Sequence, residues 1–213
     1  MQRVLAAFRI VLAAASLAGI VVQLVLSVQA SFGIVDFFSY FTILGNLFAS
    51  VVFVVAAVRS LRGVPSTPGW ELTRGAAVVY IAFVGVVFNT LLVGADLGEL
   101  RPWINVVHHM VMPVAVVLDW LVDPPRYRIP VWTVPAAVTV PAVYTAYTLV
   151  RGPVTGFIPY PFFDPDAVGG YGAVALYCAG LLVGFLVLAA LTRWAGNALG
   201  RRAAVRRGAS RTL

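Results

Sequence analysis

The sequence predicts an all-α, polytopic membrane protein with six transmembrane helices, and three observations lead to this fold class. The 213 residues are 61% hydrophobic, with a mean hydropathy of +0.95. Only 11% of them are charged, against about 25% in a typical soluble domain. Six apolar segments approach or exceed the roughly 20 residues that a helix needs to cross a bilayer.

The six predicted spans leave no room for a sizeable soluble domain, so residues 1–194 are expected to form one transmembrane domain. The spans are 4–28, 37–58, 75–94, 102–122, 130–150 and 170–194. The first apolar stretch is longer than that of a cleaved signal peptide, which predicts a retained helix. Pro130, Pro135 and Pro141 predict a kink in the fifth span.

The arginines orient the predicted bundle. All 15 basic residues are arginines, and 13 of them fall on one side of the spans: Arg3, Arg9, Arg59, Arg62, Arg74, Arg126, Arg128, Arg193, Arg201, Arg202, Arg206, Arg207 and Arg211. The other side has only Arg101 and Arg151, together with five of the eight acidic residues: Asp36, Asp96, Glu99, Asp164 and Asp166. Because positive charge marks the cytoplasmic side, both termini are expected in the cytoplasm.

The net charge of +7 is typical of many nucleic-acid-binding proteins, but here the arginines lie in loops and in the tail 195–213. A topology signal explains this distribution, so no nucleic-acid partner is expected. The tail is basic and low in apolar residues. It is therefore predicted to be a disordered cytoplasmic segment that contacts anionic lipid.

The predicted loop 151–169 reads RGPVTGFIPYPFFDPDAVG and is long for a bundle loop. Its aromatic residues and prolines are unlike a flexible linker. Two interpretations stay open for it: a lid or re-entrant cap in the interface, or an aromatic belt at the level of the headgroups.

Polar residues gather at one depth near the outer ends of four predicted spans. Thr42 and His108 each lie about 8 Å below the outer surface, at 1.5 Å of rise per residue. Residues at a similar depth in the third and fifth spans are Asn89, Thr90, Tyr144 and Thr148. Because polar groups in apolar surroundings need partners, this shared depth predicts a polar pocket that opens outward.

Helical spacing predicts contacts within this group. Thr42 and Asn46 are four residues apart and share a helix face. Asn105 stands three residues before His108 and four before His109, so either imidazole could meet its amide.

A second interpretation of the same polar residues also stays open. Side chains such as Asn46, Asn89, Thr90 and Asn105 join membrane helices through hydrogen bonds. A buried histidine is often a hydrogen-bonded core group, and Tyr40 also suits an interfacial position. These residues would then stabilise the bundle without forming a ligand site.

Several kinds of site are excluded by what the sequence lacks. Cys178 is the only cysteine, so neither an intramolecular disulfide nor a zinc cluster can form. His108 and His109 have no nearby carboxylate and make a poor metal site, and no cofactor motif is present.

An ion pump is disfavoured because no carboxylate lies near the middle of a predicted span. Asp119 is close to the inner end of the fourth span. We expect it to pair with Arg126 or Arg128 at the cytoplasmic surface.

Three motifs give the sequence a likeness to a known family. SYFTILGN at 39–46 is followed by HHMVMPVAVVLDWL at 108–121 and GFIPYPFFD at 156–164. In spans, order and spacing, residues 5–190 resemble the androgen-induced membrane-protein family, including its bacterial multi-pass branch. The most specific points are Tyr40-x-Thr42, the histidine five residues before Pro113, and Tyr160-Pro-Phe.

Animal members of that family are multi-pass hydrolases of fatty acid esters of hydroxy fatty acids. The resemblance implies a lipid-like carboxylic ester as substrate, in a bacterial-type plasma membrane, with no cofactor and no metal. It implies Thr42 as the nucleophile and His108 as the histidine, because the family histidine precedes the proline by five residues. His109 ranks second.

The implied chemistry is consistent with these residue types. A threonine hydroxyl needs a base to take its proton, and a histidine can later protonate the leaving alcohol. Asn105, a tyrosine hydroxyl or a backbone carbonyl would orient the imidazole, since no acid lies at this depth. Asn46 or Asn89 are candidates for an oxyanion donor. Two alternatives are a non-catalytic lipid or apolar-ligand binding or transport protein, and a purely structural bundle.

Overall fold

The structure, a computed structural model, describes residues 2–95 and 101–209 and confirms the all-α class. It is 81% helical, and the described ranges contain no strand. Within these described ranges, six helical spans are long and apolar enough to cross a membrane. They are α1 (Gln2–Gln29), α3 (Phe41–Leu61), α4 (Pro68–Leu91), the run of α5 (Pro102–Val106), η1 (Val107–Val111) and α6 (Met112–Val122), the pair α7 (Thr133–Ala136) and α8 (Thr139–Thr155), and α10 (Tyr171–Ala209). The chain is therefore a multi-pass membrane protein.

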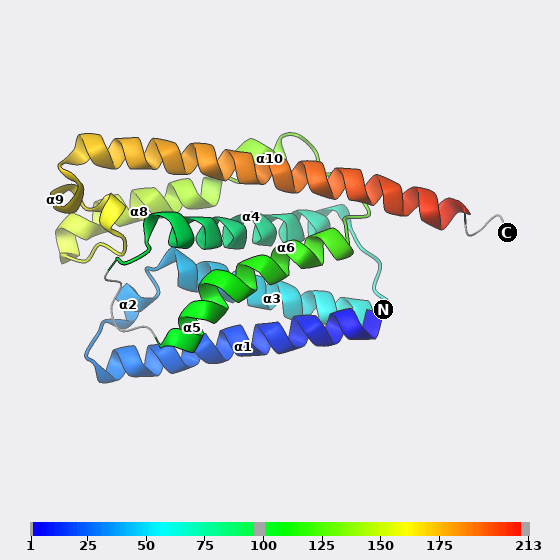
Figure 1. Ribbon diagram of the computed structural model, residues 1–213, viewed down its shortest axis with the longest axis horizontal. Helices are drawn as coiled ribbons and strands as arrows, with labels where there is room; N and C mark the ends of the chain where they lie inside the picture. Colours follow the sequence, from blue (N-terminus) through cyan, green and yellow to red (C-terminus); the bar gives the residue numbers. More distant parts are fainter. Residues whose placement is uncertain (1, 96–100, 210–213) are drawn as a thin grey trace.

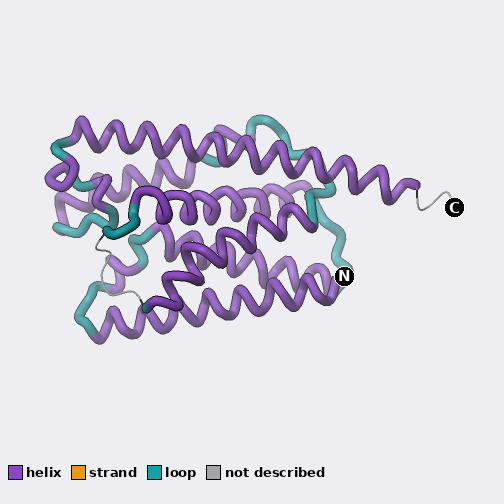
Figure 2. Tube along the Cα trace, viewed as in Figure 1, coloured by secondary structure: helices purple, strands orange, loops and turns teal. Residues whose placement is uncertain are grey.

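The spans run up and down beside one another, and the loops gather at the two ends of the bundle (Figure 2). Both termini lie at the same end, which we call the arginine end (Figure 1). The opposite end, called here the tyrosine end, holds three short elements: α2 (Ile34–Phe37), the 3₁₀ turn η2 (Pro161–Phe163) and α9 (Pro165–Val168).

Helix α4 is the centre of the packing, because it contacts α3, α6 and α10. Figure 1 shows α1 on one flank of the bundle and α8 with α10 on the other. The crossing of α4 with α6 depends on Gly85. A Cβ atom at this position would lie 2.7 Å from Cβ of Pro113, so only glycine permits this approach.

Two helices begin at different residues from those predicted. The second span was expected from residue 37, but Ser39 and Tyr40 are not helical, so α3 begins only at Phe41. The third span begins at Pro68, before the expected residue 75. Its first turn is capped by Thr67, whose hydroxyl accepts a hydrogen bond from the Trp70 amide at 3.2 Å. The cap at Thr67 and the proline at the first helical position allow the helix to begin in a polar segment.

The prediction of a disordered tail from residue 195 differs from the structure, in which α10 continues as a helix to Ala209. The segment is rich in alanine and arginine and has no proline, and both residue types favour helix. Residues 210–213 lie outside the described part, as do Asp96 and Glu99 of the charge argument.

The expected irregularity of the fifth span is confirmed, since α7 ends at Ala136 and α8 begins at Thr139. Pro141 has no amide hydrogen to donate to the carbonyl four residues earlier, at Ala137. The Tyr80 hydroxyl donates to that carbonyl instead, at 3.5 Å. A neighbouring side chain thus supplies the bond that a proline removes.

Candidate functional site

The two histidines lie in η1, a π-helical turn within the fourth span. Pro113 cannot donate to the carbonyl of His109, its normal helical partner. The Met112 amide donates to Val107, five residues earlier, and so leaves the His108 carbonyl without a helical donor as well. Two adjacent carbonyls therefore need partners from outside the helix.

Asn46 on α3 and Asn89 on α4 supply those partners in the same way. The Asn46 amide donates to the His108 carbonyl at 3.3 Å and to its own helix at Thr42, at 2.9 Å. The Asn89 amide donates to the His109 carbonyl at 3.0 Å and to Gly85 at 2.7 Å. Both asparagines thus join helices around the π-helical turn, as the structural interpretation of the sequence expects.

The ring of His108 points toward α1 and is 1% exposed. Its Nε2 lies 3.0 Å from the carbonyl oxygen of Ser16. Because a carbonyl only accepts, Nε2 carries the hydrogen. Gly19 makes room for the ring, since a Cβ there would stand 3.0 Å from Nε2. This arrangement is that of a hydrogen-bonded histidine between helices.

The ring of His109 is held by Asn105 and Phe88. Its Nδ1 lies 2.7 Å from Oδ1 of Asn105 and 3.1 Å from the carbonyl of the same residue. The ring is stacked on Phe88, with centroids 3.6 Å apart. Since both neighbours of Nδ1 are acceptors, Nδ1 carries the hydrogen and Nε2 keeps a free lone pair. Asn105 therefore orients His109 rather than His108.

Thr42 is the second residue of α3, at the helix N-terminus, where backbone amides lack helical partners. The hydroxyl of Tyr160 accepts from the Thr42 amide at 3.2 Å and lies 3.3 Å from Thr42 Oγ1. Tyr160 lies outside the spans, and burial raises the pKa of its phenol. A protonated phenol thus closes the first turn of α3.

Other tyrosines surround this contact. The Tyr144 hydroxyl donates to the Ser39 carbonyl at 2.8 Å. The ring of Tyr40 packs edge-on against Tyr160, with centroids 5.7 Å apart. These contacts connect the break before α3 to α8 and to residues 156–170, which we call the cap. The cap buries Tyr160, Phe162 and Phe163, so the lid interpretation describes it better than an aromatic belt.

A cavity of about 430 Å³ lies beneath the cap, among α3, α4, α8 and α10, and we call it the tyrosine cavity. Its walls are almost entirely apolar. Side chains with a hydroxyl or thiol on these walls are Thr42, Tyr144, Thr145, Tyr160 and Cys178. The cavity also borders exposed residues of α8 and α10, including Ala142 and Leu182, so it opens toward the lipid-facing flank.

The structure brings some predicted site residues together and keeps others apart. Thr42, Tyr144 and Tyr160 border the tyrosine cavity, whereas no histidine borders it. In the described residues, no hydrogen bond joins the Thr42 hydroxyl to either imidazole. The residues at similar predicted depth therefore form two groups, one at the tyrosine cavity and one around the π-helical turn.

The sequence reasoning missed the apolar wall of the cavity. Phe163 from the cap and Phe185 from α10 border the same space as Thr42. The aromatic and proline content of the cap was the available signal, whereas Phe185 lies in a uniformly apolar span without any distinguishing pattern.

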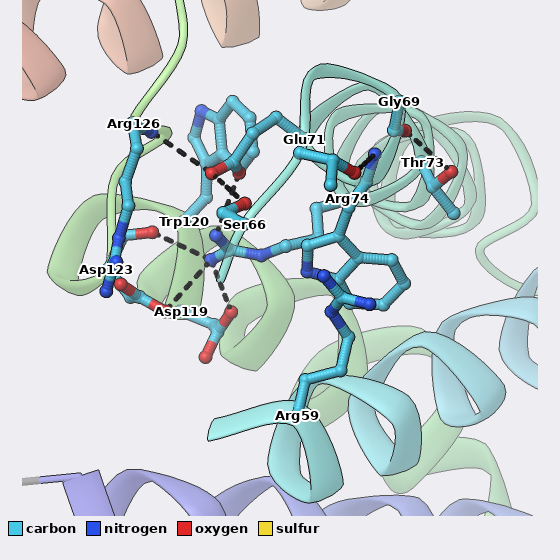
Figure 3. A network of polar contacts seen from close by, with 12 residues as sticks. Arg59, Ser66, Gly69, Glu71, Thr73, Arg74, Asp119, Trp120, Asp123 and Arg126 are labelled. Carbon is cyan, nitrogen blue, oxygen red and sulfur yellow. Dashed lines mark hydrogen bonds and ion pairs between the residues drawn. The ribbon is translucent and has the colours of Figure 1, made fainter. Parts of the chain in front are cut away.

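At the arginine end, α1, α4 and α6 meet in a buried ion-pair network. Figure 3 shows the part of it that joins Arg74 of α4 to Asp119 of α6. Asp119 accepts from Arg9 at 2.7 Å and from Arg74 at 3.2 Å. The expected pairing of Asp119 with Arg126 or Arg128 is therefore wrong. Asp119 is 5% exposed and lies between helices, whereas Arg126 and Arg128 are exposed at the surface.

Glu71 completes the network. It pairs with Arg74 at 3.2 Å, and its second oxygen accepts from the Ser66 hydroxyl at 2.6 Å and the Arg126 amide at 3.1 Å (Figure 3). Arg74 also donates to the Asp123 carbonyl at 2.7 Å. The carboxylates and guanidinium groups thus satisfy one another, as buried charges require.

No group of three or more metal-binding side chains occurs in the residues that the structure covers. The chain matches no protein-family model, no curated protein and no solved structure. Its function is therefore argued from the geometry of its own sites.

Proposed function

We propose that this membrane protein binds a ligand with a fatty acyl chain in the tyrosine cavity, with the polar group of the ligand against Thr42 and Tyr160. The observation that carries this proposal is the cavity itself. Its volume of about 430 Å³ and its apolar walls suit a flexible hydrocarbon chain. Its few hydroxyls can donate hydrogen bonds to a carbonyl or carboxylate.

The opening of the cavity supports a ligand that comes from the bilayer. Ala142 and Leu182 are exposed on the flank formed by α8 and α10, and both border the cavity. A lipid-like molecule could enter there without crossing water. At the other side, the cap covers the cavity with buried aromatic rings such as Phe162.

The same proposal includes an orientation. The arginine distribution supports cytoplasmic termini, which would place the tyrosine cavity in the outer leaflet. Reporter fusions at residue 213 test this, because a reporter that is active only in the cytoplasm should be active there. Activity of a reporter that requires export would reverse the orientation.

Binding is tested with cis-parinaric acid, a fatty acid whose fluorescence rises in apolar sites. The purified protein should bind it saturably, and methyl oleate should displace it. Ala142→Trp fills the cavity and should weaken binding roughly tenfold, which is about 1.4 kcal/mol. The control is Val143→Trp, because Val143 is 65% exposed and does not border the cavity. Equal affinities in both variants would disprove the site.

A second candidate function is the ester hydrolysis that the family resemblance implies, and the place of Thr42 on the cavity wall favours it. Thr42 Oγ1 would attack the ester carbonyl carbon, and a base would take its proton and return it to the leaving alcohol. Water would then release the acid from the acyl-threonine. Because neither imidazole borders the cavity, this reaction requires a histidine ring to turn toward Thr42.

Hydrolysis and simple binding are separated by a fluorophosphonate probe and by ester turnover. Hydrolysis predicts labelling of Thr42 that Thr42→Val abolishes and Thr42→Ser retains. Variants His108→Gln and His109→Gln then identify the base. If the protein still binds cis-parinaric acid but the ester stays intact and Thr42 is not labelled, the function is binding.

A further inference from the structure

A second cavity, of about 190 Å³, lies at the arginine end between α4, α7 and α10, and we call it the arginine cavity. Most of its walls are apolar, including Leu72, Val79 and Ala189. The tyrosine cavity lies further along the same three-helix groove, since it borders α4, α8 and α10. A buried cluster that contains Phe185 and Tyr80 lies between the two.

Arg193 of α10 borders the arginine cavity, and its charge has no partner in the described chain. Its Nε is buried and makes no hydrogen bond, and no ion pair of this side chain is present among the described residues. A buried guanidinium nitrogen without an acceptor is costly, since such groups normally find one. The free donor therefore points to an anionic ligand.

The one carboxylate that borders the same cavity is already used. Glu71 is 1% exposed and accepts from Arg74, Ser66 and the backbone amide of Arg126. Both of its oxygens are thus occupied within the ion-pair network, and Arg193 stays without an ion-pair partner among the described residues.

Trp120 builds the floor of this cavity. Its indole donates to the Thr192 carbonyl at 3.0 Å and fits against Gly196, where a Cβ would stand only 2.6 Å from the ring. The indole also packs close to Gly75 of α4, where an added Cβ would lie 3.5 Å from the ring. Trp120 therefore holds α10 in place, and so fixes the position of the turn that carries Arg193.

A second indole lies at the rim. Trp132 borders the cavity and is 57% exposed, next to the start of α7. Tryptophan favours the membrane–water interface, where lipid headgroups lie. The cavity therefore combines an apolar wall, an interfacial aromatic residue and an unpaired arginine, which together match the parts of an amphiphile.

We propose that the arginine cavity binds an anionic phospholipid, whose phosphate pairs with Arg193 and whose acyl chain lies along the apolar wall between α4 and α10. The guanidinium offers a planar set of donors that suits a phosphate oxygen pair. A small anion would pair with Arg193 but leave the apolar wall uncovered, whereas an amphiphile would contact both. This site is distinct from the tyrosine cavity and stands without the function proposed there.

The proposal is tested by tryptophan quenching, because Trp120 and Trp132 border the site. The full chain is reconstituted in phosphatidylcholine vesicles, and brominated phosphatidylglycerol or brominated phosphatidylcholine is titrated in. The wild type should prefer phosphatidylglycerol about tenfold, as expected for one charge-assisted hydrogen-bonded pair. Arg193→Gln should abolish most of this preference, and Arg193→Lys should keep part of it.

Arg201→Gln is the matched control, since Arg201 is an exposed arginine on the same helix. It accounts for general attraction of anionic lipid to the basic helix end and should leave the preference unchanged. Equal losses in Arg193→Gln and Arg201→Gln would overturn the site. So would displacement of the lipid by millimolar sodium phosphate, because the ligand would then be a free anion. Unchanged unfolding midpoints would show that both variants fold.

Discussion

At the arginine end, charged side chains join α1, α4 and α6, whereas at the tyrosine end mainly neutral hydroxyls join α3, α8 and the cap. Arg9 and Asp119 are both nearly inaccessible and paired at 2.7 Å. The contact of Thr42 with Tyr160 is longer, at 3.3 Å, and borders a large cavity. The difference suggests that buried charges fix one end of the bundle, while weaker neutral contacts leave room for a ligand at the other.

The contrast between the two ends is tested most strongly by removing Asp119, the acid at the centre of the ion-pair network. Asp119→Ala removes the buried carboxylate that pairs with both Arg9 and Arg74 and leaves them only Asp123 and Glu71; removing one partner from a buried ion pair costs about 3–5 kcal/mol. The free energy of unfolding, measured by SDS denaturation in mixed micelles, should fall by this amount. Asp166→Ala, at an exposed acid of the tyrosine end, is the control and should be nearly neutral. Equal effects would contradict the contrast between the ends.

The helix crossing between the two ends is tested at Gly85. In Gly85→Ala, the new methyl would meet Pro113 at 2.7 Å, so α4 and α6 must separate, at a cost of about 1–3 kcal/mol. Gly180→Ala on α10 is the matched control, because no atom lies within 4 Å of its added Cβ. The same unfolding assay measures both, and a stable Gly85→Ala would show that the crossing is looser than described.

A smaller effect is expected at the π-helical turn, where a double-mutant cycle isolates one hydrogen bond. Asn89→Ala leaves the His109 carbonyl without its side-chain donor, at a cost of about 0.5–1.5 kcal/mol. In the Pro113→Ala background an amide hydrogen is restored four residues after that carbonyl. Asn89→Ala should then cost clearly less. Strict additivity of the two changes would refute the explanation of Asn89.

An effect of similar size is expected at the tyrosine end, and it depends on pH. The pKa of Tyr160 is raised in the folded protein, so above about pH 10 the unfolded chain loses this proton first and stability falls. Below that pH both states are protonated and the group adds no pH dependence. Tyr160→Phe should therefore cost about 1 kcal/mol near neutral pH and flatten the alkaline loss. An unchanged alkaline slope in unfolding measurements would contradict the buried phenol.

Much of the fold follows from composition, because six apolar segments of the right length have few alternatives in a membrane. Helix ends were less predictable. Thr42 was placed inside a span that begins at residue 37, yet α3 begins at Phe41. Thr42 therefore lies in the first turn, where its free amide meets Tyr160, rather than within the helix facing His108.

Side-chain direction was the other limit. Shared depth correctly grouped Thr42 with Tyr144, but it could not show that the His108 ring points toward Ser16 of α1. Rotation about the helix axis is set by packing, and nearly uniform apolar spans leave no periodic pattern to reveal it. For the same reason the pairing of Asp119 with Arg9, 110 residues away, could not be predicted from sequence.

The ligand site is tested most directly at Cys178, the only cysteine, which borders the tyrosine cavity. Its alkylation rate by N-ethylmaleimide is measured in the purified protein with and without methyl oleate. At ten times its Kd, the ester leaves about one-eleventh of the sites free, so alkylation should slow about tenfold. In Ala142→Trp this protection should be lost, whereas Val143→Trp should keep it. An alkylation rate that methyl oleate leaves unchanged in the wild type would contradict an acyl-chain site in this cavity.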